Sequence, residues 1–171
     1  YSSDAKRERL LVPQIRLGSP ALDNFKYSSS GAMVDPHSGV VMGGSVLPLD
    51  DNATDAIRQA VWADVISRYD FACAMYDKAK MQAAVSVEDE DKAPCFSEAP
   101  VEKYYEEQLP ASLTSIDMAA WERRLNEISA FFKMNPNLQN GSASLNFSTL
   151  RTYFVNTEGS EVVQNRVTAR L

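Results

Sequence analysis

Apolar and polar positions alternate most regularly in the last third of the chain. Period-two runs rich in β-branched and aromatic residues cover Leu145–Val155 and Val163–Leu171. Between them lies the short turn Asn156-Thr157-Glu158-Gly159. Glycine can adopt a positive φ and asparagine can bond its own backbone, which are the properties that a tight reversal needs. The pattern predicts an antiparallel β-hairpin with strands of about 11 residues each.

Two upstream segments instead repeat their apolar residues every three or four positions, which is typical of amphipathic helices. The first helix is expected from about Thr54 to Ala84, after the capping residues Asp50-Asp51-Asn52. Its apolar stripe comprises Ile57, Val61, Val65, Tyr69, Ala72, Tyr76, Ala79 and Ala83, widened by Trp62 and Ile66. The second is expected to begin near Thr114 or Ser115 and to stop at Asn135-Pro136. Its buried stripe comprises Trp121, Leu125, Ile128 and Phe132.

The remaining segments have less regular patterns. Residues 6–17 alternate like a strand, in which Pro13 removes a backbone donor and suggests an edge position or a bulge. Residues 18–51 are rich in Gly, Ser and Pro and are predicted to form a long irregular loop, in which Val40-Val41-Met42 is a possible strand. Residues 85–113 are predicted to be an acidic, proline-punctuated connection.

These elements predict an α+β fold. We expect an antiparallel sheet that contains the long terminal hairpin and is covered on one face by the two helices. The 171 residues favour a single domain, 1–171. Because the chain begins at Tyr1 without Met and ends within the second strand of the hairpin, we expect it to be a piece of a longer polypeptide.

Charge and composition narrow the classes of partner. The net charge is −6 and the pI is about 4.8, so the chain repels phosphate and nucleic-acid binding is not expected. There is no apolar run near about 18 residues, so no membrane span is predicted. The residues contain no signal-peptide pattern, but export stays possible because the true N-terminus is expected to precede Tyr1. Two cysteines, Cys73 and Cys95, make no disulfide framework, and both their pairing and the compartment stay open.

No complete set of catalytic or metal-binding residues is visible. His37 is the only histidine, so a zinc site with two imidazoles on one helix cannot be built, and Asp35, Asp50 and Asp51 are its nearest potential co-ligands. The serine run 28–31 lacks the pattern of a nucleophile elbow, and the glycines of 39–44 match no phosphate-binding loop. The acidic run 88–91 lacks the spacing of a calcium loop. His37 therefore stays a weak ligand candidate.

The segment Arg151–Val162 resembles the "vNSEG" hairpin in the N-terminal domain of the TldD/PmbA family of metallopeptidases, also labelled modulators of DNA gyrase. Thr157 stands where the family usually has Ser. Three further segments are similar to parts of that domain: Leu11–Gly18 followed by Leu22-Asp23-Asn24, then Pro48–Ala79, then Ser115–Phe132. The likeness covers most of the chain and is most specific at the hairpin.

The resemblance implies a non-catalytic N-terminal module that helps to form a dimer and encloses the peptide substrate. The family's zinc ligands, a His-Glu-x-x-x-His helix and a Cys, lie in a C-terminal half and match no position here, so no cofactor is expected in this chain. The implied partners are the C-terminal peptidase domain, a second copy or related subunit, and a peptide; typical members are cytoplasmic. The alternative is a free-standing domain that binds a peptide or protein through the edge of its sheet.

Overall fold

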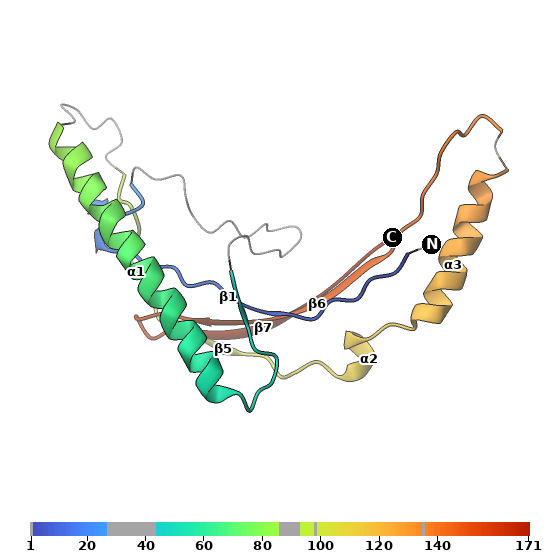
Figure 1. The fold of residues 1–171 in the computed structure, drawn as a ribbon, viewed down its shortest axis with the longest axis horizontal. Helices are drawn as coiled ribbons and strands as arrows, with labels where there is room; N and C mark the ends of the chain where they lie inside the picture. Colours follow the sequence, from blue (N-terminus) through green and yellow to red (C-terminus); the bar gives the residue numbers. More distant parts are fainter. Residues whose placement is uncertain (1, 27–43, 86–92, 98, 135) are drawn as a thin grey trace. The chain divides into compact units, whose positions relative to one another are not determined.

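The computed structural model describes residues 2–26, 44–85, 93–97, 99–134 and 136–171. The chain forms two compact units, Tyr1–Glu98 and Ala99–Leu171, which are considered separately (Figure 1). Helices and strands occur in both, which confirms the α+β class. The expectation of a single domain over 1–171 stays a prediction.

The first unit is a long helix laid on short strands. Strand β1 (Arg9–Leu11) pairs antiparallel with β4 (Ser45–Leu47), and β2 (Gly18–Ser19) pairs antiparallel with β3 (Leu22–Asp23). Helix α1 (Thr54–Val85) contacts β3 and β4. Three apolar residues are buried among the described residues, and all belong to this unit: Leu47, Ala72 and Ala79.

The first predicted helix is therefore confirmed, with a narrower buried stripe than expected. Ala72 and Ala79 are buried, whereas Trp62, Ile66 and Tyr69 are exposed. The prediction that these larger side chains belong to the core is wrong. The strands that α1 contacts are only two or three residues long, so they cover a narrow strip of the helix.

Two predictions upstream of α1 also change. Of the strand expected over residues 6–17, only Arg9–Leu11 pairs with another described strand, and Pro13, which has no N–H to donate, lies just beyond its end. The segment 18–51 is not uniformly irregular, because β2 and β3 form a miniature hairpin and Ser45–Leu47 pairs with β1. The possible strand Val40-Val41-Met42 lies outside the described residues.

The second unit is built around the terminal hairpin. Strand β6 (Asn146–Val155) pairs antiparallel with β7 (Glu161–Arg170) over ten consecutive residues, so the predicted long hairpin is confirmed. A third strand, β5 (Lys103–Tyr105), lies on the other side of β7 and runs parallel to it. The strand order is β5-β7-β6, and β5 comes from the segment predicted to be only a connection.

The turn of the hairpin has a specific hydrogen-bond pattern. Asn156 N donates to Ser160 O at 3.2 Å, and Asn156 Oδ1 accepts from Ser160 N at 2.8 Å. Gly159 has a φ of +98° and donates its N–H to Asn156 O at 3.2 Å. The asparagine side chain and the left-handed glycine thus reverse the chain between β6 and β7.

Helix α3 (Met118–Phe132) begins three residues later than its sequence suggests. Asp117 is its N-cap and accepts from Ala120 N at 3.0 Å, whereas Ser115 has an extended backbone after the separate short helix α2 (Ala111–Thr114). The prediction of Thr114 or Ser115 as the cap is wrong, because helix α2 ends there and Asp117 supplies the carboxylate that caps α3.

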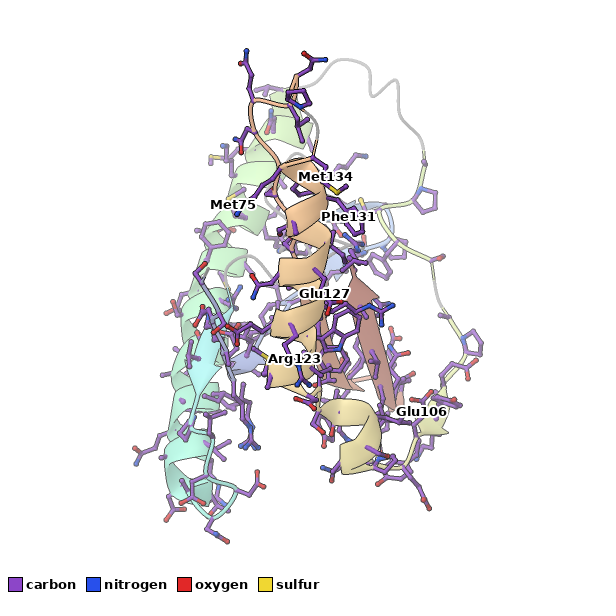
Figure 2. All side chains as sticks on the ribbon, turned by 90° about the vertical axis from the view of Figure 1, so that its right-hand side faces the viewer. Met75, Glu106, Arg123, Glu127, Phe131 and Met134 are labelled. Carbon is purple, nitrogen blue, oxygen red and sulfur yellow. The ribbon has the colours of Figure 1, made fainter. Side chains whose placement is uncertain are left out.

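The predicted stripe of α3 is only half-buried. Trp121, Leu125, Ile128 and Phe132 are all of intermediate exposure, and no residue of α3 is fully buried. Figure 2 shows Arg123, Glu127, Phe131 and Met134 along another side of the helix, where Phe131 and Met134 are strongly exposed. Helix α3 therefore presents apolar side chains on more than one side.

Substituting Asp117 with Ala should lower the free energy of unfolding of the second unit by about 1 kcal/mol, because the carboxylate is the acceptor for an N–H in the first turn. Asp117→Asn keeps an acceptor and is the control, with an expected loss of only a few tenths. Urea unfolding followed by Trp121 fluorescence measures both. Equal stability of Asp117→Ala and the parent chain would mean that the cap contributes nothing.

Candidate binding surface on the three-stranded sheet

Backbone hydrogen bonds hold β5 on one edge of the hairpin. Glu161 N donates to Glu102 O at 2.8 Å, and Glu106 N donates to Val163 O at 2.9 Å. The buried Ser160 Oγ accepts from Glu102 N at 3.0 Å. An extended segment distant in sequence is thus added to β7 chiefly by main-chain bonds.

The carboxylate of Glu106 continues this ladder beyond the end of β5. Its Oε2 accepts from Asn165 N at 2.6 Å and from Asn165 Nδ2 at 3.1 Å, and its Oε1 accepts from Tyr104 Oη at 2.9 Å. The bond from the Asn165 backbone, followed by that from the Tyr104 hydroxyl, holds the pKa of Glu106 below its ordinary value. The same contact raises the pKa of Tyr104, because its hydroxyl donates to a carboxylate.

Arg151 crosses the sheet from β6 to the β5 side. Its Nη1 donates to Asn165 Oδ1 at 2.9 Å, its Nη2 to Glu106 O at 3.0 Å, and its Nε to Tyr153 Oη at 2.8 Å. Its Cζ lies 5.7 Å from the ring centroid of Tyr105 and 5.4 Å from that of Tyr153. The guanidinium of Arg151, the single charged group of β6, therefore lies toward β7 and away from the outer edge of β6.

Acid should weaken the attachment of β5. Because the folded pKa of Glu106 is depressed, its stabilisation is complete above the unfolded pKa, about 4.5, and is lost as the pH falls through the folded value. Glu106→Gln should lower the melting temperature at neutral pH, and this deficit should shrink below pH about 4.5. Melting curves of both chains between pH about 3 and 7 check this; a deficit that is independent of pH would exclude the carboxylate as the cause.

The outer edge of β6 has a regular set of unpaired backbone groups. Asn156 and Ser160 form a hydrogen-bonded pair, and such pairs alternate with non-hydrogen-bonded ones in an antiparallel ladder. The β6 residues of the non-hydrogen-bonded pairs direct their N–H and C=O groups outward. These residues are Phe147, Thr149, Arg151, Tyr153 and Val155.

The hydrogen bonds on the other side of β7 support this choice of the β6 residues that direct their backbone groups outward. Glu161, Val163 and Asn165, which oppose those outward residues in register, are the ones that bond to β5 and Glu106. Among the residues that the structure describes, no strand pairs with the outward groups of β6. The sheet therefore has one edge that is capped and one that is available.

Large apolar side chains are exposed on this sheet. They are Tyr104 and Tyr105 on β5, Leu150, Tyr153, Phe154 and Val155 on β6, and Val167 on β7. Because side chains alternate along a strand, these residues lie on both faces of the sheet, and exposed apolar surface of this extent is typical of a sheet that another surface covers. An open edge flanked by apolar side chains suits association with another polypeptide better than it suits a small polar ligand.

The residues singled out from the sequence do not converge on one site. Asn156, Thr157, Glu158 and Gly159 form the hairpin turn, whereas His37 and Asp35 lie outside the described residues. Asp50 Oδ1 accepts from Asn52 N at 2.9 Å, and Asp51 pairs with Arg9. Across the described parts of the chain, no group of three or more His, Cys, Asp or Glu residues is placed to hold a metal ion.

The two thiols are both unpaired. Cys73 lies on α1, where its contact with the Tyr69 hydroxyl raises the pKa of that tyrosine. Cys95 lies in the connection, where its backbone N donates to Pro20 O at 2.7 Å. The possible pairing of Cys73 with Cys95 is therefore absent from this structure.

Glu106, Arg151 and Asn165 were not identified from the sequence. Arg151 and Asn165 each occupy an ordinary position in the alternating pattern, and Glu106 belongs to a polar connection. Once the turn is placed, the register sets Arg151 opposite Asn165, and this pair of long polar side chains on adjacent strands is the signal that was available.

Comparisons with protein-family models, with curated proteins and with solved structures gave no match. None of the described helices combines the length and the hydropathy needed to cross a membrane.

Proposed function

We propose that this chain is a non-catalytic module of a TldD/PmbA-like zinc metallopeptidase, contributing to dimer assembly and to enclosure of the peptide substrate. The observation that carries the proposal is the three-stranded sheet: its turn, Asn156–Gly159, is the segment that resembles the family, and its outer edge is open. The exposed apolar residues on the same sheet support a surface that another polypeptide covers.

The reaction itself is assigned to polypeptide beyond this chain. Three of the described carboxylates are engaged in structural contacts: Asp23 with Arg16, Asp64 with Arg68, and Glu106 with Asn165. These residues do not fit a zinc site, which needs three or more converging ligands. The chain's contribution is to position strands and to present an edge.

The proposal is tested by comparing this chain with the same chain extended past Leu171 in its parent gene. We expect a His-Glu-x-x-x-His segment downstream, stoichiometric zinc and peptide hydrolysis in the extended form, and neither zinc nor hydrolysis in residues 1–171 alone. Tight stoichiometric zinc in the short chain, or turnover abolished by His37→Ala, would contradict the proposal.

The open edge of β6 also favours a second candidate, a free-standing domain that binds a peptide or another protein by strand addition. A stop codon directly after Leu171 would support this reading, because no peptidase half would follow. In that case the short chain should bind its partner without any further polypeptide.

A further inference from the structure

Strand β6 lacks the features by which exposed edges usually avoid pairing. It has no proline, no lysine and no acidic residue, and its ten pairs with β7 keep one register without a bulge. Its single charged residue, Arg151, donates hydrogen bonds to Asn165 and Glu106 and so does not place its charge at the outer edge. By contrast, β5 has three residues and is flanked by Glu102, Glu106 and Pro100.

We infer that β6 pairs antiparallel with β6 of a second copy of this chain, in a register centred on Leu150, so that the two sheets become one. The inference rests on the proposed function and deepens it by naming the partner and the surface. In such a dimer, β6 residues with outward backbone groups must lie opposite one another. The two β6 strands can therefore slide past each other only by two residues at a time.

Cross-strand complementarity selects among these alignments. Centring on Leu150 places Phe147 opposite the partner's Tyr153, Thr149 opposite the partner's Arg151, and Leu150 opposite its own copy. Aromatic and aliphatic pairs therefore meet on both faces of the joined sheet. Shifting the centre to Arg151 would place two guanidinium groups directly opposite, and shifting it to Thr149 would oppose Phe147 to an arginine.

The charge of the chain restricts which of its edges can self-associate. Two chains that each carry a net charge of −6 repel one another, and β6 contains no negative residue, so pairing through this edge brings none of the repelling carboxylates of β6 together. The centred pairing forms about eight backbone hydrogen bonds, two for each hydrogen-bonded pair. The opposite edge shows that the sheet accepts an added segment by main-chain bonds, because β5 is held there in this way.

A disulfide trap tests the register in the full 171-residue chain with Cys73→Ala and Cys95→Ser. Leu150→Cys should give a covalent dimer under copper–phenanthroline oxidation, because directly opposed residues have Cβ atoms about 5 Å apart. Val167→Cys is the matched control: Val167 has a similar exposure, 43% against 41% for Leu150, but lies on the central strand. It should stay monomeric on a non-reducing gel.

Blocking the edge provides an independent measurement. Thr149→Pro removes an outward N–H and leaves the β6–β7 bonds intact, so the dimer seen in sedimentation equilibrium should be lost while the hairpin persists. Leu150→Lys places two ammonium groups opposite each other in the dimer and should weaken dimerisation at least about tenfold, a change of about 1.4 kcal/mol. This variant tests the same edge without the backbone change that a proline introduces. Val167→Lys is its control and should dimerise like the parent chain.

The outcomes separate this inference from the proposed function. A monomer at all concentrations, a dimer not trapped at Leu150→Cys, or equal trapping at Val167→Cys would each overturn the β6 pairing. Protection of β6 by an extended peptide in place of a second copy would overturn it as well. If the chain fails to pair through β6 but still binds its downstream peptidase half, only the inference fails; if it binds neither, the proposed function fails too.

Discussion

Replacing Gly18 with alanine is expected to lower the free energy of unfolding of the first unit by about 3–5 kcal/mol, the largest effect of any single substitution considered for this chain. Gly18 has a φ of +118°, which side-chain-bearing residues rarely adopt. A Cβ at this position would lie 2.3 Å from Leu22 O and 2.8 Å from the ring of Tyr76 on α1. The backbone carbonyl cannot move without breaking the β2–β3 turn.

Gly159→Ala is the matched control, because it introduces the same backbone strain without the collision. Gly159 has a φ of +98°, and a Cβ there would meet only Val101 Cγ1, at 3.9 Å. The expected cost is about 1–3 kcal/mol. Thermal and urea unfolding of both variants measure the difference; equal losses would mean that Gly18 is needed for its φ alone and that its approach to Tyr76 is unimportant.

Arg16→Ala should destabilise the first unit by about 3 kcal/mol, because it leaves a buried carboxylate without its counter-ion. Asp23 is fully buried; its Oδ1 accepts from Phe25 N at 2.9 Å, and its Oδ2 faces Arg16 Nη1 at 3.4 Å. The guanidinium also donates to Cys95 O at 3.2 Å, and its Cζ lies 5.4 Å from the ring centroid of Phe25 and 4.8 Å from that of Phe96. The side chain thus fixes the connection at 93–97 to the β2–β3 turn.

An exposed ion pair provides the comparison for Arg16. Arg58 and Asp55 on α1 lie 3.3 Å apart, and both side chains are largely in solvent. Arg58→Ala should cost no more than about 0.5 kcal/mol. A double-mutant cycle of Arg16→Ala with Asp23→Ala should give a clear coupling energy. Additive losses at these two positions would show that the ion pair does not stabilise the unit.

The parts of the fold that were predictable are those set by local pattern. The hairpin follows from period-two alternation and from the turn at Asn156–Gly159, and α1 follows from a long stripe without Gly or Pro. The start of α3 was missed because three polar residues within four positions, Thr114, Ser115 and Asp117, can all cap a helix. Only the extended backbone at Ser115 and the bond from Ala120 N to Asp117 distinguish them.

The parts that were not predictable depend on contacts between distant residues. Glu106 reaches Asn165 only because β5 pairs in parallel with β7. A strand of three residues is too short for a hydrophobic periodicity that would predict this pairing. Trp62 was assigned to the core from its spacing, but spacing cannot show how wide a strip the neighbouring strands cover. The open edge of β6 likewise becomes visible only when strand order is known.

Hydrogen exchange at β6 tests most directly the central claim that this chain acts by presenting a strand edge. Thr149, Arg151 and Tyr153 direct their amides outward, whereas Leu150 and Thr152 direct theirs to β7. If β6 pairs with a second copy, the three outward amides should exchange rapidly in dilute solution and become protected as the protein concentration rises. The inward amides should stay protected at every concentration. Outward amides that exchange rapidly at every concentration, while protection instead develops on the exposed side of α1, would contradict it.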